Sequence, residues 1–340
     1  MLFKFDEVSK MIEAGKLLHI AGTESLLRKL PKGKWIGGST EDFMSEDGGK
    51  VSNELLFITE FPYEKFSVKP YGTDNIDRVV ADAFEYGFSI LVMPFDSPVQ
   101  KEYAKKAESF EGMFMKNLAG WVSGVNLNVP GQTPVAVDGM TGTVYSDKAV
   151  ALHLEVPEGK TVSINMINIF EQDEKSPLIE FTEEGFSAKK CLIDGKEMNF
   201  AQYLSENGID TKLPLVGDYS GNGINISIKS VLVKQHETVL LNLKDASSRK
   251  NEESVVNFYA PVFSGIKYRM AKKVSDYDKE FNSRLAGLNG KNVVFSCNCI
   301  LNFLYGGLEG KSIGAFVGPI TFGEIVYQLV NQTLVYVSVE

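Results

Sequence analysis

Short apolar runs and helical patterns take turns along the first hundred residues, which is typical of layered α/β or α+β proteins. Residues 17–21 and 88–95 are mostly apolar and predict buried strands. Residues 73–86 carry apolar side chains at helical spacing and stop before Gly87, so they predict a helix. Residues 98–118 predict a second, longer helix.

Further along the chain the pattern becomes strand-like. Residues 143–145, 149–156 and 161–169 are rich in β-branched side chains and predict strands. Residues 171–177 are acidic, contain a proline and interrupt this pattern, so we place a domain boundary there. The remainder predicts strands at 191–194, 224–233, 238–243 and 293–297, helices at 200–204 and 275–288, and a hairpin of 325–330 with 333–339.

We therefore expect an α+β fold of two domains, 1–172 and 173–340, each a mostly antiparallel or mixed β-sheet covered by helices. No internal repeat is visible in the sequence. The chain has 340 residues and is 44% hydrophobic, which is enough to build a substantial core and excludes a disordered protein.

Charge and cysteine content indicate the cellular compartment of the protein and argue against some classes of partner. The chain has 35 Lys and Arg against 44 Asp and Glu, a net charge of −9, and its basic residues do not cluster. Nucleic acid and anionic membranes are therefore poor partners. Residues 1–10 lack the order of a signal peptide, no apolar run is long enough to span a membrane, and three cysteines fit a reducing compartment. We expect a cytoplasmic protein.

Familiar catalytic and metal motifs are missing from the sequence. Residues 306–312 (GGLEGKS) resemble a phosphate-binding loop, but the spacing of their glycines is wrong. Cys297 and Cys299 form a C-x-C pair, and the rest of the chain does not supply an evident set of further zinc ligands. No G-x-S-x-G sequence occurs. We expect no catalytic residue and no metal.

Several segments together resemble the FIST sensory-domain family. Residues 317–325 (VGPITFGEI) resemble its C-terminal signature, and residues 292–297 look like the strand ending in Cys that precedes it. Residues 192–204 look like the opening of a FIST C domain. Residues 35–40 (WIGGST) and 138–154 are similar to parts of a FIST N domain. The resemblance makes 1–172 FIST N-like and 173–340 FIST C-like.

The resemblance implies a stand-alone intracellular sensor. Such a module binds a small molecule, suggested to be amino-acid-like, and acts on kinase, cyclase or chemoreceptor partners in trans. One position departs from the family: Ile300 stands where an arginine is common. An aliphatic side chain cannot bind an anion as arginine does, so the ligand class is left open at this point.

The same segments supply the candidate ligand-binding residues for a small polar metabolite. Glycines allow close approach of backbone to a ligand, and hydroxyl, amide and carboxylate groups orient it. The candidates are Gly37, Gly38, Ser39, Thr40, Cys297, Asn298, Thr321, Gly323 and Glu324. Among these, Glu324 is expected to accept hydrogen bonds from an ammonium or hydroxyl group. The alternative is that the glycines serve turns or bulges.

Two other function classes are carried as alternatives. Some FIST proteins look like haem-based sensors of nitric oxide, which would require His19, His153 or His236 as axial ligand. A cysteine-dependent hydrolase would use Cys297 as nucleophile, which requires a lowered thiol pKa and a nearby base.

Overall fold

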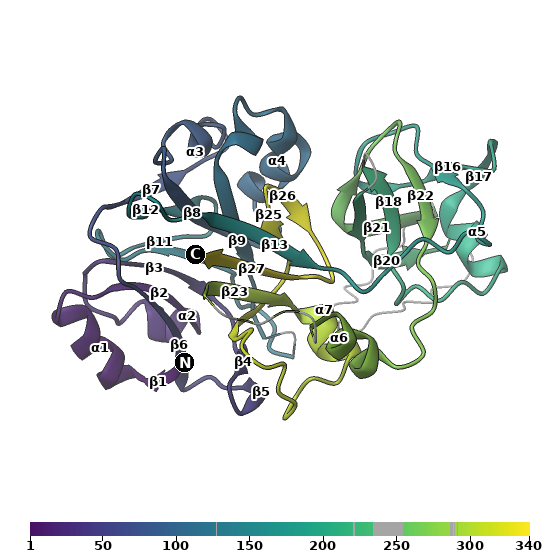
Figure 1. Ribbon diagram of the computed structural model, residues 1–340. Coiled ribbons are helices and arrows are strands. Elements are labelled where there is room, and N and C mark those ends of the chain that lie inside the picture. Colours follow the sequence, from purple (N-terminus) through teal and green to yellow (C-terminus); the bar gives the residue numbers. More distant parts are fainter. Residues whose placement is uncertain (127, 220–221, 234–253, 286–287, 289, 291) are drawn as a thin grey trace. The chain divides into compact units, whose positions relative to one another are not determined.

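The computed structural model describes residues 1–126, 128–219, 222–233, 254–285, 288, 290 and 292–340 (Figure 1). The chain forms two compact units. The main unit contains Met1–Ile167, Phe281–Leu329 and Thr333–Glu340, and the inserted unit contains Asn168–Glu280 and Val330–Gln332. Both units are built mostly from mixed or antiparallel sheets with few helices, so the expected two-domain α+β class is confirmed.

The grouping of residues differs from the predicted division at 172. The first segment of the main unit ends at Ile167, close to the acidic stretch that marked the boundary. The predicted second domain, 173–340, is divided between the two units, because the chain returns to the main unit at Phe281. A boundary of this kind has no local signal, since 275–288 reads as one continuous amphipathic helix.

Three six-stranded sheets make up the described part of the main unit, and each is centred on one pair of parallel strands. These pairs are β2 (Leu17–Gly22) with β3 (Trp35–Ser39), β8 (Gly87–Pro94) with β9 (Asn117–Ser123), and β23 (Val293–Cys299) with β24 (Gly318–Thr321). A return strand lies antiparallel to the first strand of each pair, and an outer strand lies beside it. The return strands are β6 (Leu55–Phe61), β12 (Ala149–Glu155) and β27 (Leu334–Val339), and the outer strands are β1 (Leu2–Lys4), β7 (Phe66–Tyr71) and β13 (Val162–Ile167).

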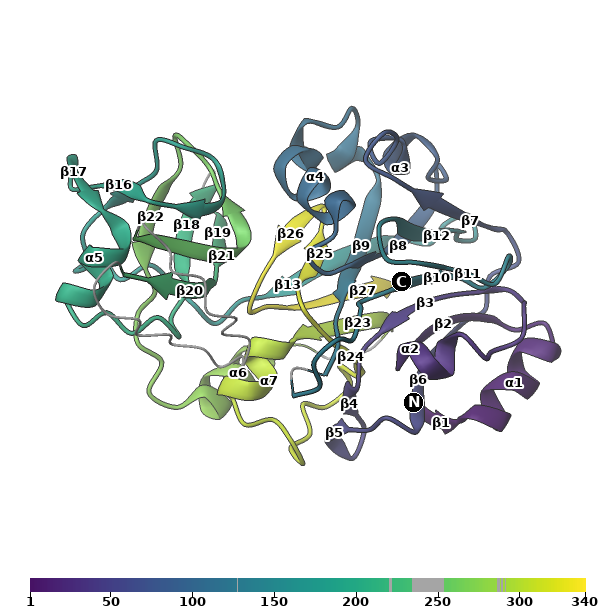
Figure 2. The same ribbon diagram turned by 180° about the vertical axis from the view of Figure 1, so that it is seen from behind.

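Each sheet is completed by a hairpin from another part of the chain (Figure 2). The hairpins are β4 (Asp42–Ser45) with β5 (Gly48–Val51), β10 (Ala136–Asp138) with β11 (Thr143–Tyr145), and β25 (Glu324–Val326) with β26 (Gln328–Val330). Strand β4 pairs with β24, β10 pairs with β3, and β25 pairs with β9. The main unit is therefore a three-fold structural repeat whose hairpins are exchanged in a cycle. No repeat is visible in the sequence, because the repeat lies in strand order and not in residue identity.

Short helices cover and connect these strands. Their bounds are α1 (Phe5–Glu13), α2 (Glu24–Leu27), α3 (Arg78–Ala81), α4 (Pro98–Lys106), α6 (Tyr277–Leu285) and α7 (Ile300–Tyr305), with 3₁₀ turns η1 (Ala107–Ser109) and η2 (Met113–Met115). The helix predicted over 98–118 is shorter: α4 ends at Lys106, and the η1 turn that follows is terminated by Phe110, whose backbone is extended. The helix predicted over 73–86 is reduced to α3, and residues 73–77 form turns in which the Asn75 side chain accepts a hydrogen bond from the Gly72 amide.

The inserted unit is a separate arrangement of antiparallel strands with one helix among its described residues. One sheet has the order β17-β16-β14-β22-β18-β19 and another the order β15-β21-β20. The bounds are β14 (Ile179–Glu180), β15 (Gly185–Ala188), β16 (Lys190–Ile193), β17 (Lys196–Asn199), α5 (Phe200–Glu206), β18 (Leu215–Tyr219), β19 (Asn222–Ile226), β20 (Ile228–Leu232), β21 (Val255–Val262) and β22 (Lys267–Met270). The strand predicted over 238–243 lies outside the described residues.

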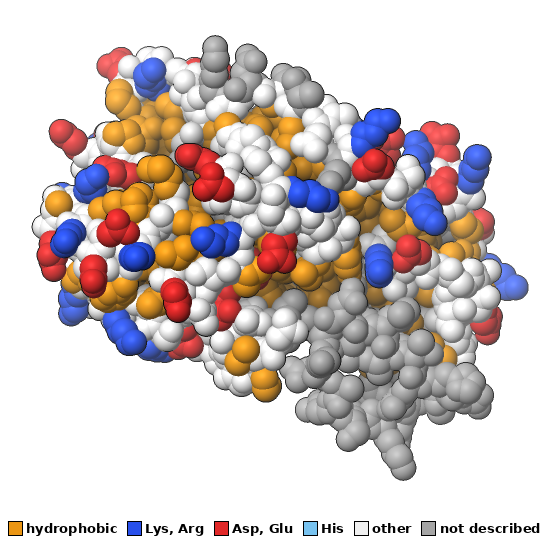
Figure 3. Space-filling view, turned by 90° about the horizontal axis from the view of Figure 1, so that it is seen from below, with side chains coloured by type: hydrophobic (Ala, Val, Ile, Leu, Met, Phe, Trp, Pro, Cys, Tyr) orange, Lys and Arg blue, Asp and Glu red, His pale blue; other side chains and the backbone are white. Residues whose placement is uncertain are grey.

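The surface carries charges of both signs. Figure 3 shows Lys and Arg side chains interspersed with Asp and Glu on the face it presents. Within the described ranges, every helix is too short or too polar to cross a lipid bilayer.

Glycines on the second parallel strands allow close contact with the first. A Cβ atom on Gly37 would overlap the backbone oxygen of Ile20, and one on Gly120 or Gly318 would overlap the backbone oxygen of Leu91 or Ser296. A Cβ on Gly38 would lie 2.6 Å from Val92 Cγ1 and 2.8 Å from Trp121 Cη2. The candidates Gly37 and Gly38 therefore serve strand packing in this structure.

We expect Gly37→Ala to lower the free energy of unfolding by about 2–3 kcal/mol, because backbone atoms must shift to admit the methyl group. Urea denaturation measures this loss. Gly159→Ala is the control: Gly159 has φ +84° and open space around its Cα, so the cost there is about 1 kcal/mol. Equal losses in the two variants would contradict the packing role of Gly37.

Candidate functional site

The second parallel strand of each repeat ends in a hydroxyl side chain: Ser39 in β3, Ser123 in β9 and Thr321 in β24. All three are at most 3% exposed. The residues at these ends bond to one another. Ser39 Oγ donates to the Gly124 carbonyl at 2.7 Å, and Thr40 Oγ1 donates to the Ile320 carbonyl at 2.8 Å. The Val122 amide donates to the Gly323 carbonyl at 2.8 Å, so the three ends close into one ring of hydrogen bonds, here called the strand-end ring.

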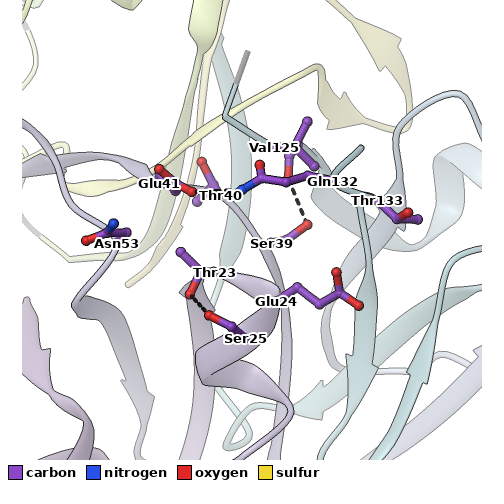
Figure 4. A pocket seen from close by; sticks show the side chains of 11 residues that line it. Thr23, Glu24, Ser25, Ser39, Thr40, Glu41, Asn53, Val125, Gln132 and Thr133 are labelled. Atoms are coloured by element: carbon purple, nitrogen blue, oxygen red, sulfur yellow. Dashed lines mark hydrogen bonds between the residues drawn. The ribbon is translucent and has the colours of Figure 1, made fainter. Parts of the chain in front are cut away.

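A pocket of about 320 Å³ opens at the end of β2 and β3 (Figure 4). Most of the side chains around it are polar. It is lined by Thr23, Glu24, Ser25, Ser39, Thr40, Glu41, Asn53, Gly124, Val125, Gln132 and Thr133. Figure 4 shows Thr40, Glu41 and Gln132 on one side and Thr23, Ser25 and Glu24 on the opposite side.

The walls of this pocket come from four short segments, one of which contributes Asn53 from the connection between β5 and β6. Thr23 caps the first turn of α2 by accepting from the Leu26 amide, which places Glu24 and Ser25 directly after β2. Thr40 and Glu41 lie between β3 and β4. Gln132 lies in the connection between β9 and β10, and the Val135 amide donates to Ser39 Oγ at 2.9 Å.

Glu41 is the most buried charged side chain of the pocket, with 8% of its surface exposed. Its Oε2 accepts a hydrogen bond from Asn126 Nδ2 at 2.8 Å, and its Oε1 accepts one from Gln132 Nε2 at 3.4 Å. No Lys, Arg or His occurs among the described residues that line the pocket. Glu24, the other acid there, pairs with Arg28 at 2.6 Å.

The neighbourhood of Glu41 is electrostatically negative. Burial, together with the charges of Glu41 and Glu309, raises the pKa of the adjacent Asp42 to about 6. Glu41 itself is partnered by two neutral amides. The pocket therefore favours cations and hydrogen-bond donors over anions.

The corresponding end of the second repeat is closed by aromatic side chains. A Cβ on Gly124 would overlap the ring of Phe322, and Phe322 packs edge-on against Phe95 at a centroid distance of 5.3 Å. The Ser123 hydroxyl below has no hydrogen-bond partner among the described residues. The structure therefore shows a strand end covered by aromatic rings.

The third strand end is filled by Glu324, which is fully buried. Its Oε1 lies 2.7 Å from Thr321 Oγ1, while the amide and hydroxyl of Thr333 donate to Oε2 at 3.3 and 2.9 Å. Burial raises the pKa of Glu324 to about 8, against the opposing hydrogen bonds from Thr321, Thr333 and Cys299. Glu324, Thr321 and Gly323 were predicted to bind ligand, but none of them lines the described pocket.

Cys297 and Asn298 are likewise part of the core. Cys297 Sγ donates to the Gly120 carbonyl at 3.5 Å, and burial, followed by the charge of Glu324, raises its pKa well above the usual value. A hydrolase nucleophile needs the opposite shift. Asn298 Oδ1 accepts from the Cys299 amide and from Asn302 Nδ2, both at 2.9 Å, and so fixes the start of α7.

The two described histidines also lie in the core. His19 Nε2 accepts from Trp121 Nε1 at 2.8 Å, and burial lowers its pKa to about 3. His153 lies 2.8 Å from the Tyr71 hydroxyl and 2.7 Å from the Ser89 hydroxyl, and burial lowers its pKa to about 4. Haem ligation by His153 would require the loss of one of these contacts, whereas His19 Nδ1 has no hydrogen-bond partner among the described residues but is fully buried. His236 lies outside the described residues.

Of the candidates from sequence, the structure brings Ser39 and Thr40 into the pocket. Sequence reasoning missed Glu41 and Gln132. Glu41 directly follows the Gly-Gly-Ser-Thr segment, so its position was a usable signal. Gln132 lies 91 residues from Glu41 in the sequence, and no sequence signal connected it with this segment.

Comparison with protein families gives one finding. The family of unknown function DUF6976 matches residues 3–242 and 232–340. The chain belongs to this family. No curated protein matches the sequence. Membership in DUF6976 assigns no ligand or activity, and it does not test the resemblance to FIST domains, which stays a hypothesis.

A pH-dependent contribution to the stability of this DUF6976 protein follows from Glu324. In the folded chain Glu324 keeps its proton up to about pH 8, whereas the reference value is 4.5. Between these values the folded state binds more protons than the unfolded state, so stability falls as pH rises and levels off above about 8. The difference between these two pKa values sets an upper limit of about 5 kcal/mol on this loss.

We expect Glu324→Gln to abolish this decline, because the amide reproduces the neutral acid: it can donate to Thr321 Oγ1 while its oxygen accepts from Thr333. Urea unfolding from pH 5 to 9 should show the variant gaining stability relative to wild type as pH rises. The buried histidines contribute in both proteins and cancel in the difference. Exposed Glu54→Gln is the control, and parallel profiles for Glu324→Gln and wild type would refute the assignment.

Proposed function

We propose that this DUF6976 protein is a non-enzymatic binding protein for a small polar ligand, which occupies the pocket at the end of β2 and β3. The observation that carries the proposal is the pocket itself: a hollow of about 320 Å³ in which hydroxyls, amides and one buried carboxylate converge. Pockets of this size that present a few convergent polar groups are the usual form of small-molecule sites.

The location of the pocket supports the same proposal. It lies at the carboxyl ends of parallel strands, where layered proteins commonly bind ligands. The strand-end ring gives its floor a fixed geometry, since Ser39 is bonded on two sides, to Gly124 and to the Val135 amide. A rigid floor lowers the entropic cost of holding a ligand.

The pocket chemistry favours binding over catalysis. Its described lining contains no thiol, and no imidazole that could activate one of its serine or threonine hydroxyls as a nucleophile. The resemblance to FIST sensory domains adds the hypothesis that signalling proteins read the bound state in trans. The haem and hydrolase alternatives gain no supporting observation from His19, His153 or Cys297.

A thermal-shift screen tests the proposal. A panel of amino acids, amines, polyols and sugars is added to the purified protein, and a compound that binds only the folded state raises its melting temperature. Ser25→Phe places a bulky ring at the exposed edge of the pocket, so we expect it to abolish any such shift while leaving the unliganded melting temperature within about 1 °C.

Ser109→Phe is the matched control, because Ser109 is also exposed and lies in η1, outside the pocket lining. It should preserve the shift. A ligand that stabilises Ser25→Phe as strongly as wild type binds elsewhere, and that result would exclude the pocket as its site.

A further inference from the structure

We infer that the ligand of this pocket carries a cationic ammonium group, bound by the carboxylate of Glu41, and hydroxyl groups that meet the remaining polar walls. The inference rests on the proposed function and names the chemical class of the ligand: a hydroxylated primary amine such as an amino alcohol or amino sugar. No residue of the described lining would neutralise an anionic group on such a ligand.

The charge of Glu41 is the first argument. Its side chain is more than nine-tenths buried, yet its hydrogen-bond partners, Asn126 and Gln132, are both neutral. Burying a carboxylate without a counter-charge is costly unless hydrogen bonds or a cation compensate. Glu24 is a weaker partner for a cationic ligand than Glu41, because Arg28 already pairs with Glu24 at 2.6 Å.

The hydrogen-bond capacity of Glu41 is the second argument. A carboxylate offers about four acceptor sites, and the two amides use one on each oxygen. The amides therefore orient the carboxylate and leave acceptor capacity for an ammonium group, which carries three donors.

The other walls specify hydroxyl groups better than a metal ion. Around the pocket the hydroxyls of Thr23 and Ser25 bond to each other at 3.0 Å, and Asn53 and Thr133 present further polar atoms. A hydroxyl group of a ligand can both donate to and accept from such groups. A calcium ion would need six to eight oxygen ligands, typically with several carboxylates, whereas Glu41 is the one acid of the described lining without a basic partner.

Matched probes separate the ammonium group from the rest of the ligand. Isothermal titration compares serinol with glycerol and serine, and glucosamine with glucose and N-acetylglucosamine. We expect serinol and glucosamine to bind at least tenfold more tightly than their neutral partners. Serine should bind more weakly than serinol, because its carboxylate meets the negative pocket.

Variants of Glu41 provide the second readout. Glu41→Gln should weaken serinol and glucosamine binding at least tenfold and leave glycerol and glucose unchanged, while Glu41→Asp, which keeps the charge, should restore part of the affinity. Glu54→Gln removes one exposed charge from the chain segment next to Asn53 and should have little effect. The melting temperatures of the unliganded variants check that each is folded.

The outcomes distinguish this inference from the proposed function. If glycerol or glucose binds as tightly as its amine, and Ser25→Phe abolishes that binding, the pocket binds small molecules but the ammonium assignment is wrong. Unchanged amine affinity in Glu41→Gln would overturn the assignment as well. If neither these probes nor any compound of the wider screen binds the wild type, the proposed function itself fails.

Discussion

The strand-end ring is the constraint on which the main unit depends. Gly37, Gly120 and Gly318 let each second strand approach the backbone of its own partner, and Gly38 lets the first repeat approach Val92 and Trp121 of the second. Buried hydrogen bonds then hold the strand ends together, such as the bond from Thr40 Oγ1 to the carbonyl of Ile320, which lies 280 positions further along the chain. Each of these polar groups would be costly to bury alone, so the three repeats stabilise one another.

The three strand ends that meet in this ring differ in what occupies them. One end is open and polar beside Glu41, one is covered by Phe322 against Phe95, and one is filled by Glu324. In each case the group that decides the outcome stands a few residues beyond a second parallel strand. A short segment can therefore convert a site into core, or the reverse, without altering the sheets.

Sequence patterns predicted those strands that are determined by their own run of apolar residues. The strands at 88–95 and 293–297 follow from continuous apolar runs and match β8 and β23 closely. The exchange of hairpins could not be predicted, because the sequence of a hairpin carries no signal for the distant sheet with which it pairs. For the candidate site, a Gly-rich turn pointed to Ser39 and Thr40, which line the pocket, whereas Glu324 lies in the core. The sequence around a polar residue does not show whether its side chain ends in a pocket or in the core.

The filled end and the open end also differ in how the chain leaves them. Thr333, which donates two hydrogen bonds to Glu324, directly follows Val330–Gln332, and those residues belong to the inserted unit. Opening this end would release both the buried carboxylate and the segment that precedes Thr333. The corresponding connection in the first repeat, from β5 to β6, is not tied to the core in this way, because it passes through exposed Asn53 at the edge of the pocket. Of the three strand ends, the first is thus the one at which the described residues form an open polar pocket.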